Sequence, residues 1–324
     1  LIQDELVTPM LNLETACPGA TEKTIICLSN FEVPVLMADI RPNVNFKVFL
    51  DKQFNALANN SAFDGLLGVM TYISYYCSPE IINWTGKLFR HYCIEGKTTL
   101  LSSEPYLLNH IKDGDFENTT SSPWTLNPAQ TGSINFATVT GYGAKQCRWL
   151  RSGNEGDTVL VMQRKSSGAN QISQTINNLV AGRLYTFRMI VADYDNMTVS
   201  QKHSVSIGIS DSNIIKSFVK ICSPYGSTTE FFNYHWILFR ANGTTANLTV
   251  KDWQDDVTPG GTIGQKLMFN YIQIQPYESY EPAGPIGEWT FNEGSGTVAG
   301  DTSRFNLPGY ENNASLNGYA SWAQ

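Results

Sequence analysis

The stretch at residues 184–191, LYTFRMIV, decides the fold class of this chain. Its side chains alternate as they do on a strand, where every second residue lies on the same face. One face would carry a run of apolar side chains: Tyr185, Phe187, Met189 and Val191. Similar runs recur at 203–209, 234–239, 246–250 and 267–274, with Gly, Asn and Ser between them. Many short strands separated by turn residues predict an antiparallel two-sheet β-sandwich over residues 106–280.

The composition of the whole chain agrees with this class and excludes others. Only 16% of the 324 residues are charged, against about 25% in an average soluble protein. The net charge of −7 gives no basic footprint, so a nucleic-acid partner is not expected. No apolar run approaches the roughly 20 residues that span a bilayer. An Asn-, Ser-, Thr-, Gly- and Tyr-rich chain suits extracellular β-proteins, so we expect a secreted or extracellular protein.

Residues 1–105 follow a different pattern, in which helices and strands alternate. Apolar spacing predicts helices near 6–16 and 46–57 and buried strands at 24–31 and 66–73. A third helix is predicted to begin with Ser78 as N-cap and Pro79 in the first turn. Strands that alternate with helices are most simply parallel. Two strands make no stable sheet, so we expect missing chain segments or a partner to complete a (β/α) barrel or an open α/β sheet.

The last part of the chain begins with the Pro/Gly-rich linker 281–286 (EPAGPI). Residues 287–324 are too few to form a core of their own. The predicted fold class is therefore a multidomain, mainly β protein with an N-terminal partial α/β barrel-like segment. Its three parts would be residues 1–105, 106–280 and 281–324.

Two motifs within the central part resemble those of a known group. The first is Gly114-Asp115-Phe116-Glu117, followed by Trp124, and the second is Gln174-Thr175-Ile176 with Leu179, Gly182 and 184–187. Together they resemble galactose-binding-like jelly-roll modules, which include many carbohydrate-binding modules. In that group the second motif is the central strand pair. The resemblance implies a jelly roll that binds a polysaccharide or an oligosaccharide.

The two flanking parts carry weaker resemblances. The run 84–93 (WTGKLFRHYC), shortly before the jelly roll, resembles the end of (β/α)₈ glycoside-hydrolase-like barrels. The tail looks like the first strands of a laminin-G or concanavalin-like domain, on these residues: Trp289, Phe291, Asp301, Leu316, Gly318 and Trp322. The central module would then be part of a larger glycan-active protein.

Sugar binding requires aromatic rings that lie on the apolar faces of pyranose rings, and polar groups that bond hydroxyls. Most aromatic side chains of a sandwich belong to its core instead. Tyr142 lies in a glycine-rich turn, Trp149 follows it, and Tyr194 stands between Asp193 and Asp195 after a strand. We therefore expect the three aromatic side chains to be accessible and to form the ligand face together with Asp193 and Asp195.

A structural calcium ion is a further expectation that comes with the resemblance. Calcium takes about six to eight oxygen ligands, and Asp113, Asp115 and Glu117 offer carboxylates near the first strand. On the last strand, where the group often has an acid, this chain has Gln273 and Gln275. The alternative is that the three acids are ordinary solvated side chains.

Catalysis is considered because a barrel glycosidase uses two carboxylates at the ends of its strands. Glu32 directly follows a predicted strand and is the candidate catalytic residue, with an ordinary loop acid as the alternative. The strand that would carry its partner is absent from the chain, so independent catalysis is not expected. The main functional prediction is a carbohydrate-binding module. The alternatives are a glycoside hydrolase with a partial barrel and a non-catalytic structural or adhesion protein.

Overall fold

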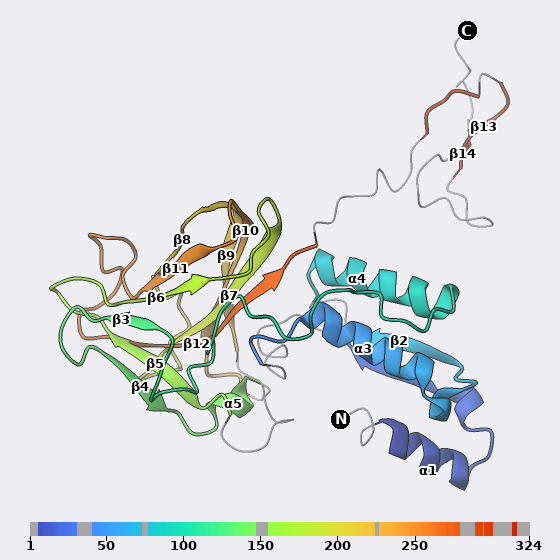
Figure 1. The fold of residues 1–324 in the computed structure, drawn as a ribbon, viewed down its shortest axis with the longest axis horizontal. Helices are drawn as coiled ribbons and strands as arrows, with labels where there is room; N and C mark the ends of the chain where they lie inside the picture. The colour runs from blue at the N-terminus through green and yellow to red at the C-terminus, as the bar shows by residue number, and fades with distance from the viewer. Residues whose placement is uncertain are drawn as a thin grey trace. The chain divides into compact units, whose positions relative to one another are not determined.

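A computed structural model describes residues 6–30, 41–72, 77–146, 155–223, 227–278, 289–293, 295–300 and 313–315. The chain divides into two compact units, Leu1–Glu278 and Ser279–Gln324. The first unit contains the sandwich and the N-terminal segment, by which we mean the described residues up to 105 (Figure 1).

The centre of the first unit is an antiparallel β-sandwich, as predicted. The larger sheet has six strands in the order β4 (Ile134–Thr138), β5 (Thr158–Gln163), β12 (Lys266–Pro276), β7 (Leu184–Asp193), β10 (Phe232–Ala241) and β9 (Ser212–Cys222). The smaller sheet has four strands in the order β3 (Thr125–Asn127), β6 (Gln171–Ile176), β11 (Ala246–Lys251) and β8 (Ser206–Ile209). Every described strand pair in both sheets is antiparallel.

The stretch LYTFRMIV forms most of β7, and its alternating apolar face lies in the main core as predicted. The opposite sides of β10 are both buried. Ile237 and Phe239 face the core, whereas Tyr234, Trp236 and Leu238 form a second cluster on the outer side of the sheet. Phe218 of the neighbouring strand stacks on Trp236 with ring centroids 4.9 Å apart. The outer side of the sheet is therefore covered near β9.

The structure differs from the sequence interpretation in the second motif of the resemblance. Residues 174–176 belong to β6 and residues 184–187 to β7, and these strands lie in opposite sheets. They are therefore not a strand pair: β6 pairs with β3 and β11, and β7 pairs with β10 and β12. The long strand β9 was not predicted, because its exposed isoleucines and lysines do not alternate in polarity.

The N-terminal segment has the predicted order of helices and strands. It contains α1 (Thr8–Ala16), β1 (Ile25–Ser29), α3 (Phe46–Asn59), β2 (Gly68–Tyr72) and α4 (Pro79–Phe89), with short helical turns at Thr21–Lys23 and Ser61–Phe63 and a π-helical turn at Arg90–Ile94. The Asn45 side chain caps α3 by accepting from the N–H groups of Lys47 and Val48, and Ser78 caps α4 as expected. Strands β1 and β2 are parallel, which confirms the predicted direction.

The two faces of the β1–β2 sheet have different surroundings. Ile26 and Leu28 are buried in one cluster with residues of α3 and α4. The other face is open, since Ile25, Met70 and Tyr72 are 51%, 47% and 54% exposed. The described residues thus form a pair of β/α units whose helices cover one face only, and a barrel is not shown.

A buried polar contact, which we call the junction, joins the N-terminal segment to the last strand of the sandwich. Lys47 Nζ lies 2.7 Å from Glu80 Oε1 and also donates to the carbonyl of Pro276. Gln275 Nε2 donates to the Val44 carbonyl at 2.6 Å. Lys47, Glu80 and Gln275 are all at most 5% exposed, so the two parts are packed together as one unit.

The second unit is described only in part. Val298–Ala299 (β13) pairs antiparallel with Ala314–Ser315 (β14), and Trp289 and Phe291 are exposed. The other residues of the laminin-G resemblance, Asp301, Leu316, Gly318 and Trp322, lie outside the described residues.

Among the described residues, no helix has the length and apolar character required to cross a bilayer.

Candidate functional site

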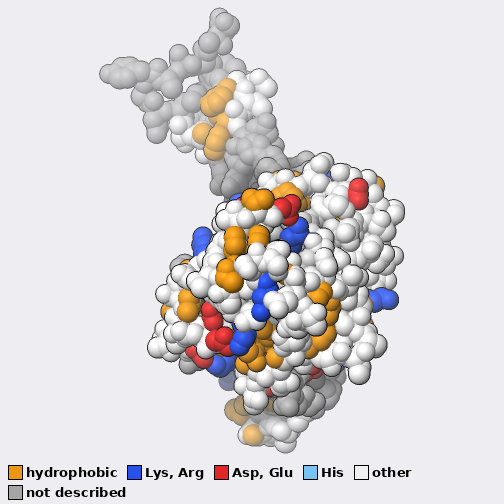
Figure 2. Space-filling view, turned by 90° about the vertical axis from the view of Figure 1, so that its left-hand side faces the viewer, with side chains coloured by type: hydrophobic (Ala, Val, Ile, Leu, Met, Phe, Trp, Pro, Cys, Tyr) orange, Lys and Arg blue, Asp and Glu red, His pale blue; other side chains and the backbone are white. Residues whose placement is uncertain are grey.

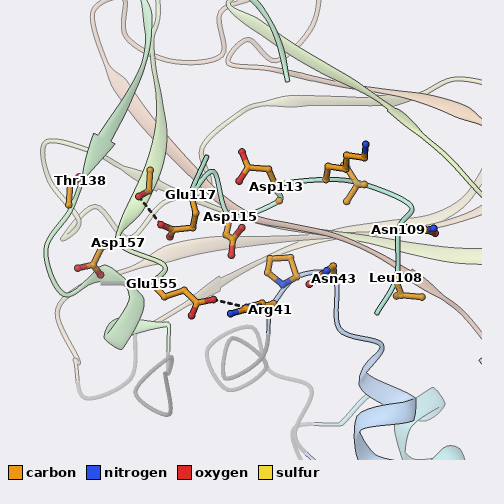
Figure 3. Close-up of a pocket in the computed structure, with 15 residues that line it drawn as sticks. Arg41, Asn43, Leu108, Asn109, Asp113, Asp115, Glu117, Thr138, Glu155 and Asp157 are labelled. Atoms are coloured by element: carbon orange, nitrogen blue, oxygen red, sulfur yellow. Dashed lines mark hydrogen bonds and ion pairs between the residues drawn. The ribbon is translucent and has the colours of Figure 1, made fainter. Parts of the chain in front are cut away.

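A cleft of about 880 Å³ opens where the N-terminal segment meets the sandwich. It is lined by residues 41–43, by residues within 108–117, by Thr138 of β4 and by the turn at 155–158. Five carboxylates line it (Figure 3): Asp113, Asp115, Glu117, Glu155 and Asp157. The three acids singled out in the sequence therefore lie together, joined by two acids from a turn distant in the chain.

Gly114 sets the position of the first three acids. The Ile272 N–H donates to the Gly114 carbonyl at 2.7 Å, and a Cβ atom on Gly114 would lie only 2.0 Å from the Ile272 carbonyl oxygen. Phe116 is fully buried and packs on Trp124, with ring centroids 5.5 Å apart. The Trp124 indole N–H donates to the Asp113 carbonyl at 2.9 Å. The contacts of Gly114, Phe116 and Trp124 thus hold this stretch of chain in place, and its acids line the cleft.

Glu117 and Asp157 hold the backbone of the cleft wall. Glu117 accepts from the Gly156 N–H at 2.6 Å and from the Thr158 hydroxyl at 3.0 Å. Asp157 accepts from the N–H groups of Gly141 and Gly143 at 2.9 and 2.7 Å. These carboxylates already have strong donors, so their main role is to shape the turns around the cleft.

Asp113 has a less satisfied carboxylate. Its Oδ1 accepts from the Asn118 N–H at 3.0 Å, whereas its Oδ2 is buried without a hydrogen-bond partner. Burial raises the pKa of Asp113, and the nearby charge of Asp115 raises it further. A protonated carboxyl at this place could donate as well as accept.

Groups of other chemistry also line the cleft, among them the cationic residue Lys112 and the apolar residues Leu108 and Ile111. Arg41 forms an ion pair with Glu155, with Nε and Oε1 2.9 Å apart, and Asn43 and Asn109 contribute amides. Donors and acceptors therefore both face the cleft. No aromatic ring is among the described residues that line it.

The hydrogen bonds of the acids bear on which of their oxygens face the cleft. Both oxygens of Glu117 and both oxygens of Asp157 accept hydrogen bonds from the chain. Among the residues that the structure describes, no group of three His, Cys, Asp or Glu side chains could hold a metal ion. A calcium ion held by Asp113, Asp115 and Glu117 stays a prediction.

Tyr142 does not have the exposure that the sequence suggested. It begins the short helix α5 (Tyr142–Lys145), and its side chain is only 1% exposed. It packs in a cluster with Val159, Ile190 and Phe232 on the outer side of the larger sheet. The flanking glycines serve the turn held by Asp157 and do not present the ring, so the prediction of an exposed Tyr142 was wrong.

The residues at the end of β7 divide into a buried one and two accessible ones. Asp193 is 8% exposed and accepts from the Asp195 and Asn196 N–H groups, as in a tight turn, and from the Gln265 amide. Tyr194 is half-buried, with Lys266 Nζ 5.7 Å from its ring centroid. Asp195 is exposed and pairs with the same lysine at 3.1 Å.

The remaining predicted site residues, Trp149 and Glu32, lie outside the described residues. The sequence interpretation missed Arg41, Glu155 and Asp157. Glu155-Gly156-Asp157 has the composition of a turn, but only the fold brings it to the stretch 113–117.

No family model and no curated protein matches the chain. Solved structures that resemble it include the enzymatically active domain of bacteriophage CBA120 tailspike protein 4, with 12% identity over 52% of this chain and a TM-score of 0.30. TmCBM61, solved in complex with beta-1,4-galactotriose, has 13% identity over 52% of this chain and 98% of its own, with a TM-score of 0.28. A putative sugar binding protein from Bacteroides thetaiotaomicron VPI-5482 has 8% identity over 52% and 99%, with a TM-score of 0.29.

The match covers only 21% of the length of the tailspike domain. At TM-scores this low, the likeness carries no argument about function, which has to come from the residues of this chain.

Proposed function

We propose that the sandwich is a carbohydrate-binding module that takes an uncharged polysaccharide or oligosaccharide in the cleft. The observation that carries this proposal is the lining of the cleft, in which carboxylates, amides and a guanidinium face a space of about 880 Å³. Ligand pockets typically enclose about 300–1,000 Å³. Planar polar groups of this kind bond pairs of sugar hydroxyls, and hydroxyls need both the donors and the acceptors that line the cleft.

The low proportion of charged residues supports an uncharged ligand, because binding of such a ligand does not depend on long-range electrostatic steering. Only 16% of the residues are charged. On the face of the molecule shown in Figure 2, hydrophobic side chains form small groups, and charges of both signs lie between them. A face with charges of both signs interspersed also suits an extracellular protein, which we propose on the same grounds.

Tyr194 and Asp195 form a second place where the same ligand could bind. Tyr194 is the accessible aromatic side chain among the described residues of the predicted ligand face, and it has a carboxylate and an ammonium beside it. Trp149 belongs to the same prediction. The cleft and this patch can be separated by mutation.

The test is affinity electrophoresis of the full chain in gels that contain neutral galactan, glucan, mannan or xylan. We expect retardation by at least one polysaccharide, lost in Asn109→Ala and Asp115→Asn. The control is Asn127→Ala, an exposed amide on β3 that does not line the cleft. Retardation lost in Tyr194→Ala instead would move the site to the second patch, and loss in Trp149→Ala would make Trp149 part of the binding site. No retardation by any polysaccharide or on a glycan array would leave a structural or adhesion role.

A specific observation favours a second candidate, a glycoside hydrolase of which the N-terminal segment is a part. Parallel sheets are covered on both faces in known folds, whereas Ile25, Met70 and Tyr72 are exposed on the open face of β1–β2. Further β/α units would cover this face and pair with both free edges. Glu32 would then be a carboxylate at the end of a barrel strand. Glycan hydrolysis that is lost in Glu32→Gln would support this candidate, and no hydrolysis of any glycoside would remove it for this chain.

A further inference from the structure

We propose that Arg41 and Asn43 of the N-terminal segment contact the same glycan as the acids of the sandwich, so that the cleft is one composite site. This inference rests on the proposed function, and it names the second wall of the site. The two residues line the cleft together with residues within 108–117 and the turn at 155–158. A ligand in the space between them has polar groups of both parts within reach (Figure 3).

Backbone contacts fix the second wall against the first. The Leu108 N–H donates to the Asn43 carbonyl at 2.6 Å, and the Asn45 N–H donates to the Tyr106 carbonyl at 2.8 Å. Pro42 is buried, and its Cβ lies 3.3 Å from the position of a Cβ on Gly114. The stretch that carries Arg41 and Asn43 is therefore packed directly on the stretch that carries the acids.

The junction fixes the same two walls from behind. Gln275 of β12 donates to the Val44 carbonyl and accepts from the Phe46 N–H at 3.2 Å. Lys47 binds Glu80 and the Pro276 carbonyl in the interior. Residues 42–47 thus have partners along most of their length, and a site with two rigid walls loses little entropy when it takes a ligand.

Arg41 has the chemistry and the freedom that a contact requires. Its side chain is 59% exposed, and its ion pair with Glu155, whose side chain is 22% exposed, joins the two parts within the lining of the cleft. Exposed pairs of this kind contribute little to stability, so sugar hydroxyls can replace water and part of the pair at small cost. The guanidinium has five N–H donors, and Glu155 accepts, so one hydroxyl pair could bond both.

The position of Arg41 in the chain relates the site to the β/α fold of the N-terminal segment. Arg41 and Asn43 belong to the connection that follows the carboxyl end of β1 and leads to α3. In parallel β/α folds, ligands lie at the carboxyl ends of the strands. Arg41 and Asn43 therefore stand on the kind of connection that carries ligand contacts in such folds.

The experiment measures the affinity of full-length variants for whichever of the four neutral polysaccharides retards the wild type. We expect Arg41→Ala to weaken binding about tenfold or more, as for a lost charged hydrogen bond, and Arg41→Lys to restore part of it. Asn43→Ala should weaken binding by a smaller factor. The matched control is Arg90→Ala, which removes an exposed ion pair with Glu95 in the same segment but does not line the cleft.

The outcomes separate this inference from the function on which it rests. If Asp115→Asn loses binding while Arg41→Ala and Asn43→Ala bind as the wild type does, the sandwich alone holds the glycan and the composite site is wrong. If Arg90→Ala weakens binding as much as Arg41→Ala, the effect is one of general charge and the inference also fails. If the wild type binds none of the polysaccharides, the proposed function itself is wrong. Circular dichroism of each variant confirms that it is folded.

Discussion

At the scale of single residues, Gly114 determines where the acids of the cleft lie. Its Cβ position is 2.0 Å from the Ile272 carbonyl oxygen, which is backbone and has no room to move. We expect Gly114→Ala to lower the free energy of unfolding by about 2 kcal/mol, as overpacking does, and to weaken glycan binding. Urea unfolding measures the first effect and affinity electrophoresis the second.

Gly86 is the matched control for this prediction. It lies on the exposed side of α4, where a Cβ would meet nothing within 4 Å. Gly86→Ala should raise stability by up to about 1 kcal/mol, because alanine favours the helix. If Gly114→Ala is as harmless as Gly86→Ala, the close approach to Ile272 does not constrain the site.

His235 makes the stability of the protein depend on pH. It is almost fully buried, and burial lowers the pKa of His235 from 6.5 to about 4. The neighbouring His203 also has a lowered pKa, for the same first reason, as does His110. Between pH 6.5 and about 4, His235 binds a proton in the unfolded chain but not in the folded chain. Stability is therefore complete above about pH 6.5 and falls by about 3 kcal/mol for His235 as the pH drops to 4.

The measurement is urea unfolding of wild type and His235→Gln at intervals between pH 7 and 4. The variant should show a smaller fall in the free energy of unfolding over this range, with the remainder due to the other buried histidines. Equal slopes for the two proteins would show that His235 is not the neutral buried group described above.

These residues also show what the sequence could and could not reveal about the site. Asp113, Asp115 and Glu117 could be singled out because they are close in sequence, on a stretch interpreted as the first strand. That strand assignment was wrong, since residues 113–117 contain a turn and the first strand of the sandwich is β3. Arg41 and Glu155 could not, because 114 residues separate the two partners of this ion pair and only the fold joins them. Tyr142 was misplaced because glycines beside an aromatic residue indicate a turn but not the direction of the ring.

At the scale of elements, the junction depends on a buried charge pair between α3 and α4. Removal of one partner leaves an uncompensated charge that is at most 5% exposed. We expect Lys47→Met to lower the free energy of unfolding by about 3–5 kcal/mol, and Lys47→Met with Glu80→Leu to recover part of that loss. Chemical unfolding followed by tryptophan fluorescence provides the measurement, since Trp84 donates to the Lys47 carbonyl at 3.0 Å.

The control pair for the junction is Lys87 and Glu278, whose atoms are 2.9 Å apart but whose side chains are 49% and 34% exposed. Lys87→Met should change stability by less than about 1 kcal/mol. A similar loss in Lys47→Met and Lys87→Met would mean that burial of the junction is not what stabilises it.

Most elements could be predicted because their signals are local. Ser78 and Pro79 mark the start of α4, and the alternation of LYTFRMIV marks β7. Strand pairing could not be predicted in this way, because the sequence of a strand does not identify the strand with which it pairs. Nothing in residues 174–176 tells that β6 joins the smaller sheet, and the register between Trp236 and Arg188 depends on the whole set of strands.

At the scale of the whole molecule, the N-terminal segment and the sandwich should unfold together. Gln275 and Lys47 connect them in the interior, and the first compact unit extends from Leu1 to Glu278. We expect amide protons of α4 and of β12 to lose hydrogen-exchange protection at the same denaturant concentration. Earlier loss of protection in α3 and α4 would show that the segment opens on its own and that the junction is weak.

The junction affects how a polysaccharide would bind to this protein. A module on a flexible tether explores a volume and raises the local concentration of its target over a range of distances. The sandwich is instead held to the N-terminal segment by buried hydrogen bonds of Gln275 and Lys47. A polysaccharide bound in the cleft would therefore be held in a fixed position relative to the N-terminal segment. If the proposed function holds, the sandwich would present a bound polysaccharide to the N-terminal segment in one fixed orientation.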